Sequence, residues 1–260
     1  GPGLIGGLLV GLSLAKALSL AWKVPFIGVN HVEGHLYANF LAHPELEPPL
    51  VGLTVSGGHT QLIYMPEHGQ YELLGQTRDD AAGEAFDKVA RVLGLGYPGG
   101  PLLDRLAQTG QPKLTLVQHD ALAGTYDFSF SGLKTAVVNL VHNLNQKGEA
   151  LPAADVAASF QRQVVTVLVE RTFRAVVAKK VKTLSLSGGV AANSELRACF
   201  TEEAKARGVK LYYPPLELCT DNAAMIAACG YFRYRRNGPS PLDLPVNPRL
   251  RFESGFKIVD

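Results

Sequence analysis

Cysteine is scarce in this sequence, and the few cysteines present exclude one class of protein. Cys199, Cys219 and Cys229 are an odd number, and their spacing matches neither a zinc knuckle nor a disulfide framework. A small secreted fold held together by disulfides is therefore excluded, and free thiols favour a reducing compartment. We expect a cytoplasmic protein.

Charge is scarce as well. Only 18% of the 260 residues are charged and the formal net charge is +2, so no strong overall field attracts nucleic acid. A nucleic-acid partner must therefore be argued from local patches. Hydrophobic residues make up 47% of the chain, which is typical of a globular protein, and the length allows two lobes.

Two common sequence features are missing. No Gly-Lys-Ser/Thr sequence follows a glycine-rich loop, so the chain has no Walker-type phosphate loop. The chain does not begin with Met, and we expect it to begin inside a domain.

Residues 3–22 are the one long apolar stretch, with Lys16 as their only ionisable side chain. Their length would cross a bilayer. However, Ser13 and Lys16 fall near the middle, no basic segment precedes the stretch as in a signal peptide, and a strand-like run follows at once. We therefore predict a core helix and no membrane partner.

Hydrophobic periodicity predicts an α/β protein. The expected strands are residues 24–29, 50–56, 59–65, 70–77, 183–187 and 209–213. The expected helices are residues 4–22, 30–42, 81–93, 102–107, 131–144, 153–180, 193–207 and 220–236. Gly57 and Gly58 predict a tight hairpin between the second and third strands, and the proline-rich residues 43–49 predict a lobe boundary.

The segment His31-Val32-Glu33-Gly34-His35 carries the first candidate site. Residues four apart lie on the same face of a helix, so His31 and His35 can hold one metal ion between two imidazoles. Asn30 suits a helix cap, which would place the pair at a helix start. The same spacing also fits a plain polar helix face. The zinc-protease motif is not met, because it has Glu directly after the first histidine, where this chain has Val32.

A metal needs at least a third ligand, and Asp221 is the best candidate. It stands where a loop enters a helix, so Thr220 or Asp221 would by default be the helix cap. A carboxylate on the first turn of a helix can also reach an ion. A His, His, Asp set leaves open positions on the metal, which suits substrate binding rather than a closed structural site.

Glycine-rich loops provide a second kind of candidate site. The Ser-Gly-Gly segments at residues 56–58 and 187–189 each follow a buried strand. Bare backbone N–H groups in such loops can meet a phosphate or a nucleoside, and the second loop opens a helix whose positive end favours an anion. A simple turn is the alternative for each. In the rigid loop at residues 97–101, Pro101 suits the first helical position.

Seven motifs, in order, resemble those of the bacterial tRNA adenosine threonylcarbamoyltransferase family (TsaD or Gcp, with archaeal and eukaryotic Kae-type relatives). They are residues 30–35, 55–61, 80–88, 97–101, 128–135, 187–193 and 219–222. The resemblance runs from the first residue to about Arg251. The family's N-terminal strands have no counterpart in this sequence.

The resemblance implies an actin-like, sugar-kinase-like ATPase (ASKHA) fold with two lobes and a central cleft. It implies that residues 1–48 are the remainder of the first lobe, residues 49–215 the second lobe, and residues 216–260 a return to the first. The implied reaction transfers the threonylcarbamoyl group of threonylcarbamoyl-AMP to the exocyclic amine of the adenosine that follows the anticodon, in tRNAs reading ANN codons.

The resemblance also implies the site residues. The implied metal is divalent iron, with zinc as the alternative, and its ligands are His31, His35 and Asp221. The implied substrate contacts lie in the glycine-rich loops and on the helices beside them; they are Thr54, Val55, Ser56, Gly57 and Gly58 for the phosphate and acyl part, Asp87, Gly100 and Asp104 for the ribose, and Asn193 for the nucleoside. A carbamoyl adenylate is already activated, so no covalent nucleophile is needed, and we assign no general base.

The implied partners are tRNA, the TsaB-like pseudo-enzyme subunit and the TsaE-like ATPase. Two basic clusters are the candidate phosphate contacts: Arg233, Arg235 and Arg236, and Lys179, Lys180 and Lys182. Solvated helix ends are the alternative for both.

Three other functions are compatible with parts of the sequence. The first is the metalloprotease activity once attached to this family, against which Val32 argues. The second is an ATP-dependent kinase or carbamoyltransferase of the same superfold, which fits the glycine loops but not the histidine pair. The third is a truncated, catalytically inactive partner subunit.

Overall fold

A single mixed sheet organises the chain. The computed structural model describes residues 1–117 and 122–251. The sheet has the order β3-β2-β1-β4-β5, with β1 at Leu50–Val55, β2 at Thr60–Met65, β3 at Glu72–Gln76, β4 at Thr183–Ser187 and β5 at Lys210–Tyr212. The first three strands are antiparallel neighbours, whereas β4 runs parallel to β1 and β5 parallel to β4. The α/β class is therefore confirmed.

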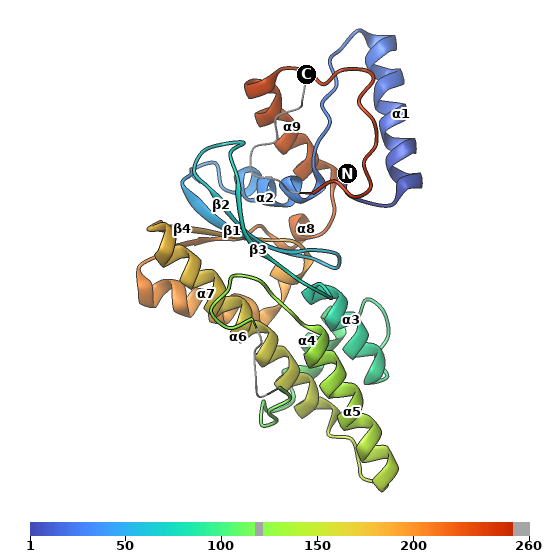
Figure 1. Cartoon of the computed structure of the whole chain (residues 1–260), viewed down its shortest axis with the longest axis vertical. Helices are drawn as coiled ribbons and strands as arrows, with labels where there is room; N and C mark the ends of the chain where they lie inside the picture. The colour runs from blue at the N-terminus through green and yellow to red at the C-terminus, as the bar shows by residue number, and fades with distance from the viewer. Residues whose placement is uncertain (118–121, 252–260) are drawn as a thin grey trace.

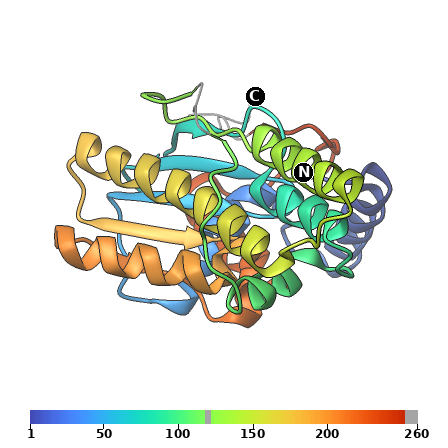
Figure 2. The ribbon, with the colours of Figure 1, turned by 90° about the horizontal axis from the view of Figure 1, so that it is seen from below.

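Helices cover both faces of the sheet (Figures 1 and 2). One face carries α2 (His31–Ala42) and α9 (Ala223–Asn237), and the other carries α6 (Ala153–Lys179) and α7 (Ser194–Arg207). Three more helices, α3 (Ala82–Val92), α4 (Gly99–Ala107) and α5 (Ser131–Lys147), extend the α6 side. The remaining short segments are η1 (Gly189–Ala192) and α8 (Leu216–Cys219).

The alternating side chains of β1 explain this layering. Val51, Leu53 and Val55 join the core on the α3, α6 and α7 side, whereas Leu50 joins the smaller core beneath α2. Successive strand residues point to opposite faces, so a strand apolar at every position is buried on both. Gly52 lets α2 approach closely, because a Cβ there would lie 2.6 Å from Leu36 Cδ1.

Most expected elements are present. The hairpin predicted at Gly57-Gly58 joins β1 to β2, with Val55 paired to Thr60. Helix α4 begins at Gly99, three residues before the expected start at Leu102, because the Asp87 carboxylate accepts hydrogen bonds from the N–H groups of Gly99 and Gly100. The expected helix at 220–236 begins at Ala223, and the separate α8 precedes it.

The strand expected at residues 24–29 is wrong. Residues 24–30 are extended but belong to no strand among the described residues. Their backbone is instead held by two isolated hydrogen bonds to the segment after α9: Gly28 N–H donates to Ser240 Oγ, and Ser240 N–H donates to the Phe26 carbonyl. The segment has the apolar sequence pattern of a strand. However, a β-strand also needs a neighbouring strand with which to form hydrogen bonds, and a sequence pattern does not show whether that neighbour exists.

The helix expected at residues 4–22 is present, but the prediction that it belongs to the core is wrong. Helix α1 (Ile5–Trp22) does form, but none of its residues is buried, and it lies apart from the sheet beside the segment that follows α9 (Figure 1). Val10, Leu14 and Trp22 are largely exposed. Among the described helices, α1 is the one long and apolar enough to cross a membrane by length and composition. Apolar composition indicates that a helix can pack against another apolar surface, but it does not identify that surface.

The lobe boundaries at residues 48 and 215 remain a prediction. In the structure α9 returns to pack on α2, which precedes the sheet in the chain. Residues 252–260 of the third expected segment lie outside the described residues.

Candidate metal centre and adjoining cleft

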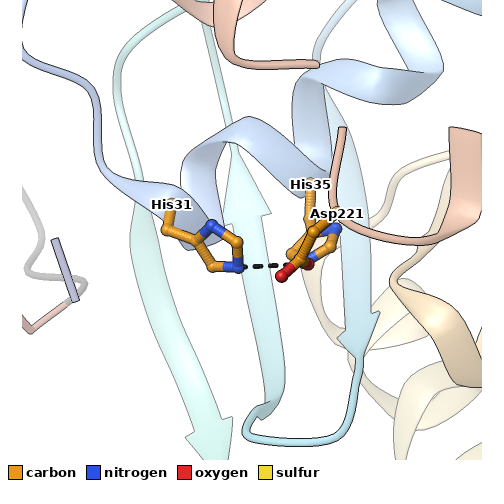
Figure 3. A group of neighbouring side chains, drawn as sticks. All are labelled: His31, His35 and Asp221. Atoms are coloured by element: carbon orange, nitrogen blue, oxygen red, sulfur yellow. Dashed lines mark ion pairs between the residues drawn. The ribbon is translucent and has the colours of Figure 1, made fainter. Parts of the chain in front are cut away.

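Three side chains from distant parts of the chain meet at the start of α2. His31 Nε2 and His35 Nε2 lie 3.4 and 3.2 Å from the same Asp221 carboxylate oxygen (Figure 3). One ligand atom from each of the three lies within 4.8 Å of the others. The two imidazole rings are nearly perpendicular, with centroids 4.8 Å apart. The three predicted ligands are therefore together, in the arrangement that a single ion could share.

Helix caps fix the elements that carry these ligands. Asn30 Oδ1 accepts hydrogen bonds from the N–H groups of Val32 and Glu33, so the predicted cap of α2 is confirmed. The expected cap of the last helix is wrong: Asn222, rather than Thr220 or Asp221, caps α9 by accepting from Met225 N–H at 2.8 Å. The Asp221 carboxylate is therefore left outside the cap and is 75% exposed.

His35 is the buried member of the set, with a side chain only 1% exposed. Burial, reinforced by the neighbouring His31, lowers the pKa of His35 from 6.5 to about 4, although Asp221 acts in the opposite direction. The imidazole is therefore neutral at pH 7. Within the described residues Nδ1 of His35 has no hydrogen-bond partner, and Nε2 faces the Asp221 carboxylate at 3.2 Å. A neutral imidazole has one ring nitrogen with a free lone pair, and a buried one without a hydrogen-bond partner fits a metal ligand.

His59 stands next to this group and was missed in the sequence. Its ring centroid lies 6.4 Å from that of His31, and burial, followed by the effect of His31, lowers the pKa of His59. It lies in the loop between β1 and β2, where its N–H donates to Ser56 Oγ. The motif at residues 55–61 contains His59, but only the fold brings it to the histidine pair.

The two Ser-Gly-Gly segments lie side by side. Because β1 and β4 are parallel neighbours, their carboxyl ends share one edge of the sheet, and Thr54 Oγ1 lies 2.9 Å from Ser187 Oγ there. Gly188 has φ +87°, and a Cβ there would overlap the Val55 carbonyl. Only glycine allows the second loop to pass so closely over the end of β1.

A third glycine brings α3 against the first loop. A Cβ at Gly83 would lie 2.6 Å from the Ser56 carbonyl, to which Gly83 N–H donates at 3.2 Å. Among the described hydrogen bonds, none uses the N–H groups of Gly57 or Gly58, and both residues are exposed. These donors therefore face open space at the sheet edge.

A cleft of about 740 Å³ opens beside the loops, which is large enough for a nucleotide. It is lined by residues of both loops, of α3, α4, η1 and α8, and of the segment before α9; they are Ser56, Gly57, Gly83, Phe86, Asp87, Tyr97, Pro98, Gly100, Pro101, Asp104, Arg105, Gly189, Val190, Ala192, Asn193, Leu216, Thr220 and Asp221. Asp221 thus belongs both to this wall and to the histidine group.

The other expected substrate residues divide into two sets. Ser56, Gly57, Asp87, Gly100, Asp104 and Asn193 line the cleft. Thr54 and Val55 are buried at the end of β1 beneath it, and Gly58 is exposed but not among the lining residues.

Hydrogen bonds hold the lining polar groups in place. One carboxylate oxygen of Asp87 accepts hydrogen bonds from the N–H groups of Gly99 and Gly100 at the start of α4. Asp104 accepts from Ser194 Oγ and from Gln161 Nε2. Asn193 caps α7 and donates to Gln161 Oε1. The family resemblance implied Asp87, Asp104 and Asn193 as site residues but not Tyr97, whose side chain is 84% exposed at the cleft wall.

One member of the basic cluster at the end of α9 is not available as a phosphate contact, whereas Arg235 and Arg236 are exposed. Arg233 is 8% exposed, and its guanidinium donates to Glu33 Oε2 at 2.8 Å, so its expected phosphate contact is wrong. Lys179 pairs with Glu72 across the surface. Arg235 and Arg236 donate to Tyr231 Oη and to the His68 carbonyl, respectively.

Comparison with known proteins gives consistent family matches. A family model described as TsaD, tRNA N6-adenosine threonylcarbamoyltransferase, matches residues 1–228. The protein of that name from Synechococcus sp. (strain JA-3-3Ab) is 55% identical over 252 residues, which are 97% of this chain and 69% of that protein. The one from Symbiobacterium thermophilum is 57% identical over 250 residues, which are 96% of this chain and 73% of that protein.

Solved structures share the fold at low sequence identity. Full-length HypF in its phosphate- and nucleotide-bound form aligns over 84% of this chain and 44% of its own, with a TM-score of 0.63 and 13% identity. HypF from T. kodakarensis aligns over 85% and 39%, with a TM-score of 0.59 and 16% identity. The ASKHA-type fold is therefore confirmed.

Proposed function

The chain belongs to the TsaD family, the tRNA N6-adenosine threonylcarbamoyltransferases, and from this membership we propose that it modifies tRNA by transferring a threonylcarbamoyl group. The donor is threonylcarbamoyl-AMP, and the acceptor is the exocyclic amine of the adenosine that follows the anticodon in tRNAs reading ANN codons. The observation that carries the proposal is the position of Asp221, which joins the histidine pair to the wall of a nucleotide-sized cleft.

The reaction is a simple exchange at one carbonyl carbon. A bond forms between that carbon and the amine nitrogen, the bond from the carbon to the AMP phosphate oxygen breaks, and the nitrogen loses a proton. Because AMP is a good leaving group, the protein has to align the two reactants and offset developing charge rather than provide a nucleophile.

The loop between β1 and β2 suits the charged part of the donor. Gly57 lines the cleft, and its N–H group, which no described hydrogen bond uses, can donate to a phosphate or carbonyl oxygen there; Gly58 is exposed next to it. Thr54 and Val55 act through the backbone of β1, which sets the direction of this loop. The hairpin is rigid because Ser56 bonds to His59 on both sides, through N–H to carbonyl and through Oγ to N–H.

The opposite part of the cleft suits the nucleoside. Asp87 uses one oxygen to hold the start of α4, which leaves its other oxygen for ribose hydroxyl groups. Gly100 and Asp104 lie on the same helix and line the same wall. Asn193 lines the cleft at the start of α7, where the helix dipole favours a polar nucleotide edge.

The histidine group fits a divalent metal. His35 offers a buried, neutral imidazole whose Nε2 faces the Asp221 carboxylate, and His31 and Asp221 supply two further donors of types that iron and zinc accept. We propose iron, with zinc as the alternative. When bound there, the ion would supply a Lewis acid and an anchor for oxygen atoms of the substrate.

The metalloprotease alternative requires a carboxylate beside the histidine pair that can act on water. The nearest one in sequence, Glu33, instead bonds to Arg233 and to Tyr71 in the protein interior. No observation favours an inactive subunit, since the ligands and the cleft are both formed by this chain.

We propose tRNA as the macromolecular substrate, with a TsaB-like subunit and a TsaE-like ATPase as partners in the cytoplasm. The test is incubation of the chain with these partners, tRNA, threonine, bicarbonate, ATP and the synthase that makes the adenylate, followed by nucleoside analysis of the tRNA. The variants Asp221→Asn and His35→Ala should lose at least 100-fold in product, about 3 kcal/mol of transition-state stabilisation.

His142→Ala is the matched control, because this histidine is exposed on α5, away from the cleft residues. It should form product at the parent rate. Normal product from Asp221→Asn and His35→Ala would reject the role of the histidine group. No product from the parent chain with all components present would reject the activity.

A further inference from the structure

We infer that the buried ion pair between Glu33 and Arg233 positions the metal ligands, by fixing the helix that carries the two histidines against the helix that follows Asp221. This inference rests on the metal site proposed above. Glu33 and Arg233 are thus positioning residues, which touch neither the ion nor the substrate.

The ion pair is one of the most enclosed polar contacts of the protein. Arg233 Nη1 donates to Glu33 Oε2 at 2.8 Å, and the two side chains are 8% and 4% exposed. The second carboxylate oxygen accepts from Tyr71 Oη at 2.6 Å. Burial raises the pKa of Tyr71 far above its usual value, so the phenol keeps its proton and donates. Both oxygens of Glu33 are therefore held, one from α9 and one from the segment before β3.

The two partners stand on the elements whose relative placement decides the metal geometry. Glu33 lies on α2 between the two histidine ligands. Arg233 lies on α9, whose first residue comes two positions after Asp221. Asn222 ties the Asp221 loop to α9, since its side chain accepts from Met225 N–H and donates to the Thr220 carbonyl at 2.9 Å. A shift of α9 along or away from α2 therefore moves the Asp221 carboxylate.

A second contact between the helices lies near the site itself. A Cβ at Gly34 would lie 2.8 Å from Ile226 Cδ1 and 3.6 Å from Met225 Cγ, so α9 approaches α2 closely beside the histidines. Arg233 lies seven residues beyond Ile226, about 10 Å further along the helix. On α2 the two contacts fall on the adjacent residues Glu33 and Gly34, whereas on α9 they are about two turns apart, so together they restrain how α9 lies against this part of α2.

Asp221 depends on this support. Its side chain is 75% exposed, and the groups near its oxygens in the described structure are the two histidines. The carboxylate is thus located by its backbone, and its backbone is located by α9. A buried ion pair is a directional contact that resists sliding more than apolar packing does, because displacement leaves a charge unpaired.

The pair could instead serve only the stability of the fold, and the affinity of the folded protein for a metal separates the two roles. A structural role lowers the unfolding temperature of the metal-free protein but leaves metal affinity unchanged once the protein is folded. A positioning role weakens the affinity as well. Supporting contacts around metal ligands typically change affinity by roughly 10- to 100-fold.

The experiment is a titration of the metal-free full chain with Co²⁺, followed by its visible absorption, together with thermal unfolding of each variant. Glu33→Gln and the double variant Glu33→Met with Arg233→Met are compared with the parent. The double variant leaves no charge buried, so it decides the question if Glu33→Gln does not fold. The matched control is Glu72→Gln with Lys179→Met, which removes an ion pair between β3 and α6, away from the site.

We expect the Glu33 variants to bind Co²⁺ on the order of tenfold more weakly, and the control to bind as the parent does. A folded double variant with the parent's affinity would overturn the inference, and so would a parent that binds no Co²⁺. Product formation on tRNA is measured separately. If the parent binds Co²⁺ and the Glu33 variants bind it weakly, but the parent modifies no tRNA, the proposed function fails and the inference stands.

Discussion

The buried imidazole of His35 predicts how the stability of the metal-free protein depends on pH. The pKa of His35 is lowered from 6.5 to about 4, mainly because the side chain is enclosed and secondarily because His31 is adjacent. In the unfolded chain the group takes up a proton below pH 6.5, whereas in the folded protein it does so only near pH 4. Between these values the unfolded state binds more protons, so acid destabilises the folded state.

The size of the effect follows from the same pKa values. A fall from 6.5 to about 4 corresponds to about 3 kcal/mol of unfolding free energy. This contribution is fully present above pH 6.5, declines as the pH falls from 6.5 to 4, and is absent below pH 4. The protein as a whole has on the order of 10 kcal/mol of stability, so the loss is large enough to measure.

The assay is urea denaturation of chelator-treated protein at intervals from pH 7 to pH 4, for the parent and for His35→Gln. Glutamine does not titrate in this range, so the variant should lack about 3 kcal/mol of the parent's pH dependence, whatever its stability at pH 7. Burial also lowers the pKa of His59 and of His68, and both histidines are present in both proteins, so the difference between the proteins reports the removal of His35. Equal pH dependence in the two proteins would refute the reasoning.

Two further predictions concern the cleft. Gly188→Ala should lower the unfolding free energy by roughly 2 kcal/mol or more, because φ is +87° and a Cβ would overlap the Val55 carbonyl; urea denaturation measures this, and an unchanged midpoint would contradict it. Tyr97→Ala should weaken AMP binding about tenfold in calorimetric titration, since an aromatic ring stacked on a base contributes roughly 1–3 kcal/mol, while stability changes by less than about 0.5 kcal/mol. Tyr234→Ala, which removes another exposed tyrosine, should change neither quantity, and equal AMP affinities for Tyr97→Ala and the parent would exclude stacking.

Patterns of short range predicted the elements that carry the site. The histidine spacing, the cap at Asn30 and the hairpin at Gly57-Gly58 depend on residues a few positions apart, where backbone geometry is restrictive. Each Ser-Gly-Gly segment was expected after a buried strand, but their meeting at one sheet edge was not predicted, because it depends on the parallel pairing of β1 with β4.

Features that depend on distant partners could not be predicted in this way. Residues 24–29 have the composition of a strand, but no strand lies beside them among the described residues. Helix α1 has the composition of a core helix, but none of its residues is buried. Arg233 was grouped with its exposed neighbours because the sequence shows a basic helix end, whereas the fold sets Glu33 opposite it from 200 residues away. His59, in the loop between β1 and β2, lies near His31 only in the folded chain, where their ring centroids are 6.4 Å apart. In each case the deciding contact crosses a long sequence separation.

The position of Glu33 within its motif explains both what it does not do and what it does. Each residue of an α-helix is rotated by about 100° from the one before it. The side chain of Glu33, two residues from each histidine, therefore projects roughly 200° around the helix axis from both. Its carboxylate therefore cannot share their face, as the glutamate of a zinc protease does by directly following the first histidine. The same angle directs it into the interior, where Arg233 and Tyr71 hold it. A shift of the glutamate by one sequence position thus distinguishes a hydrolytic motif from the one in this chain. Here the acidic residue holds the helix in place, and the two histidines are available as metal ligands.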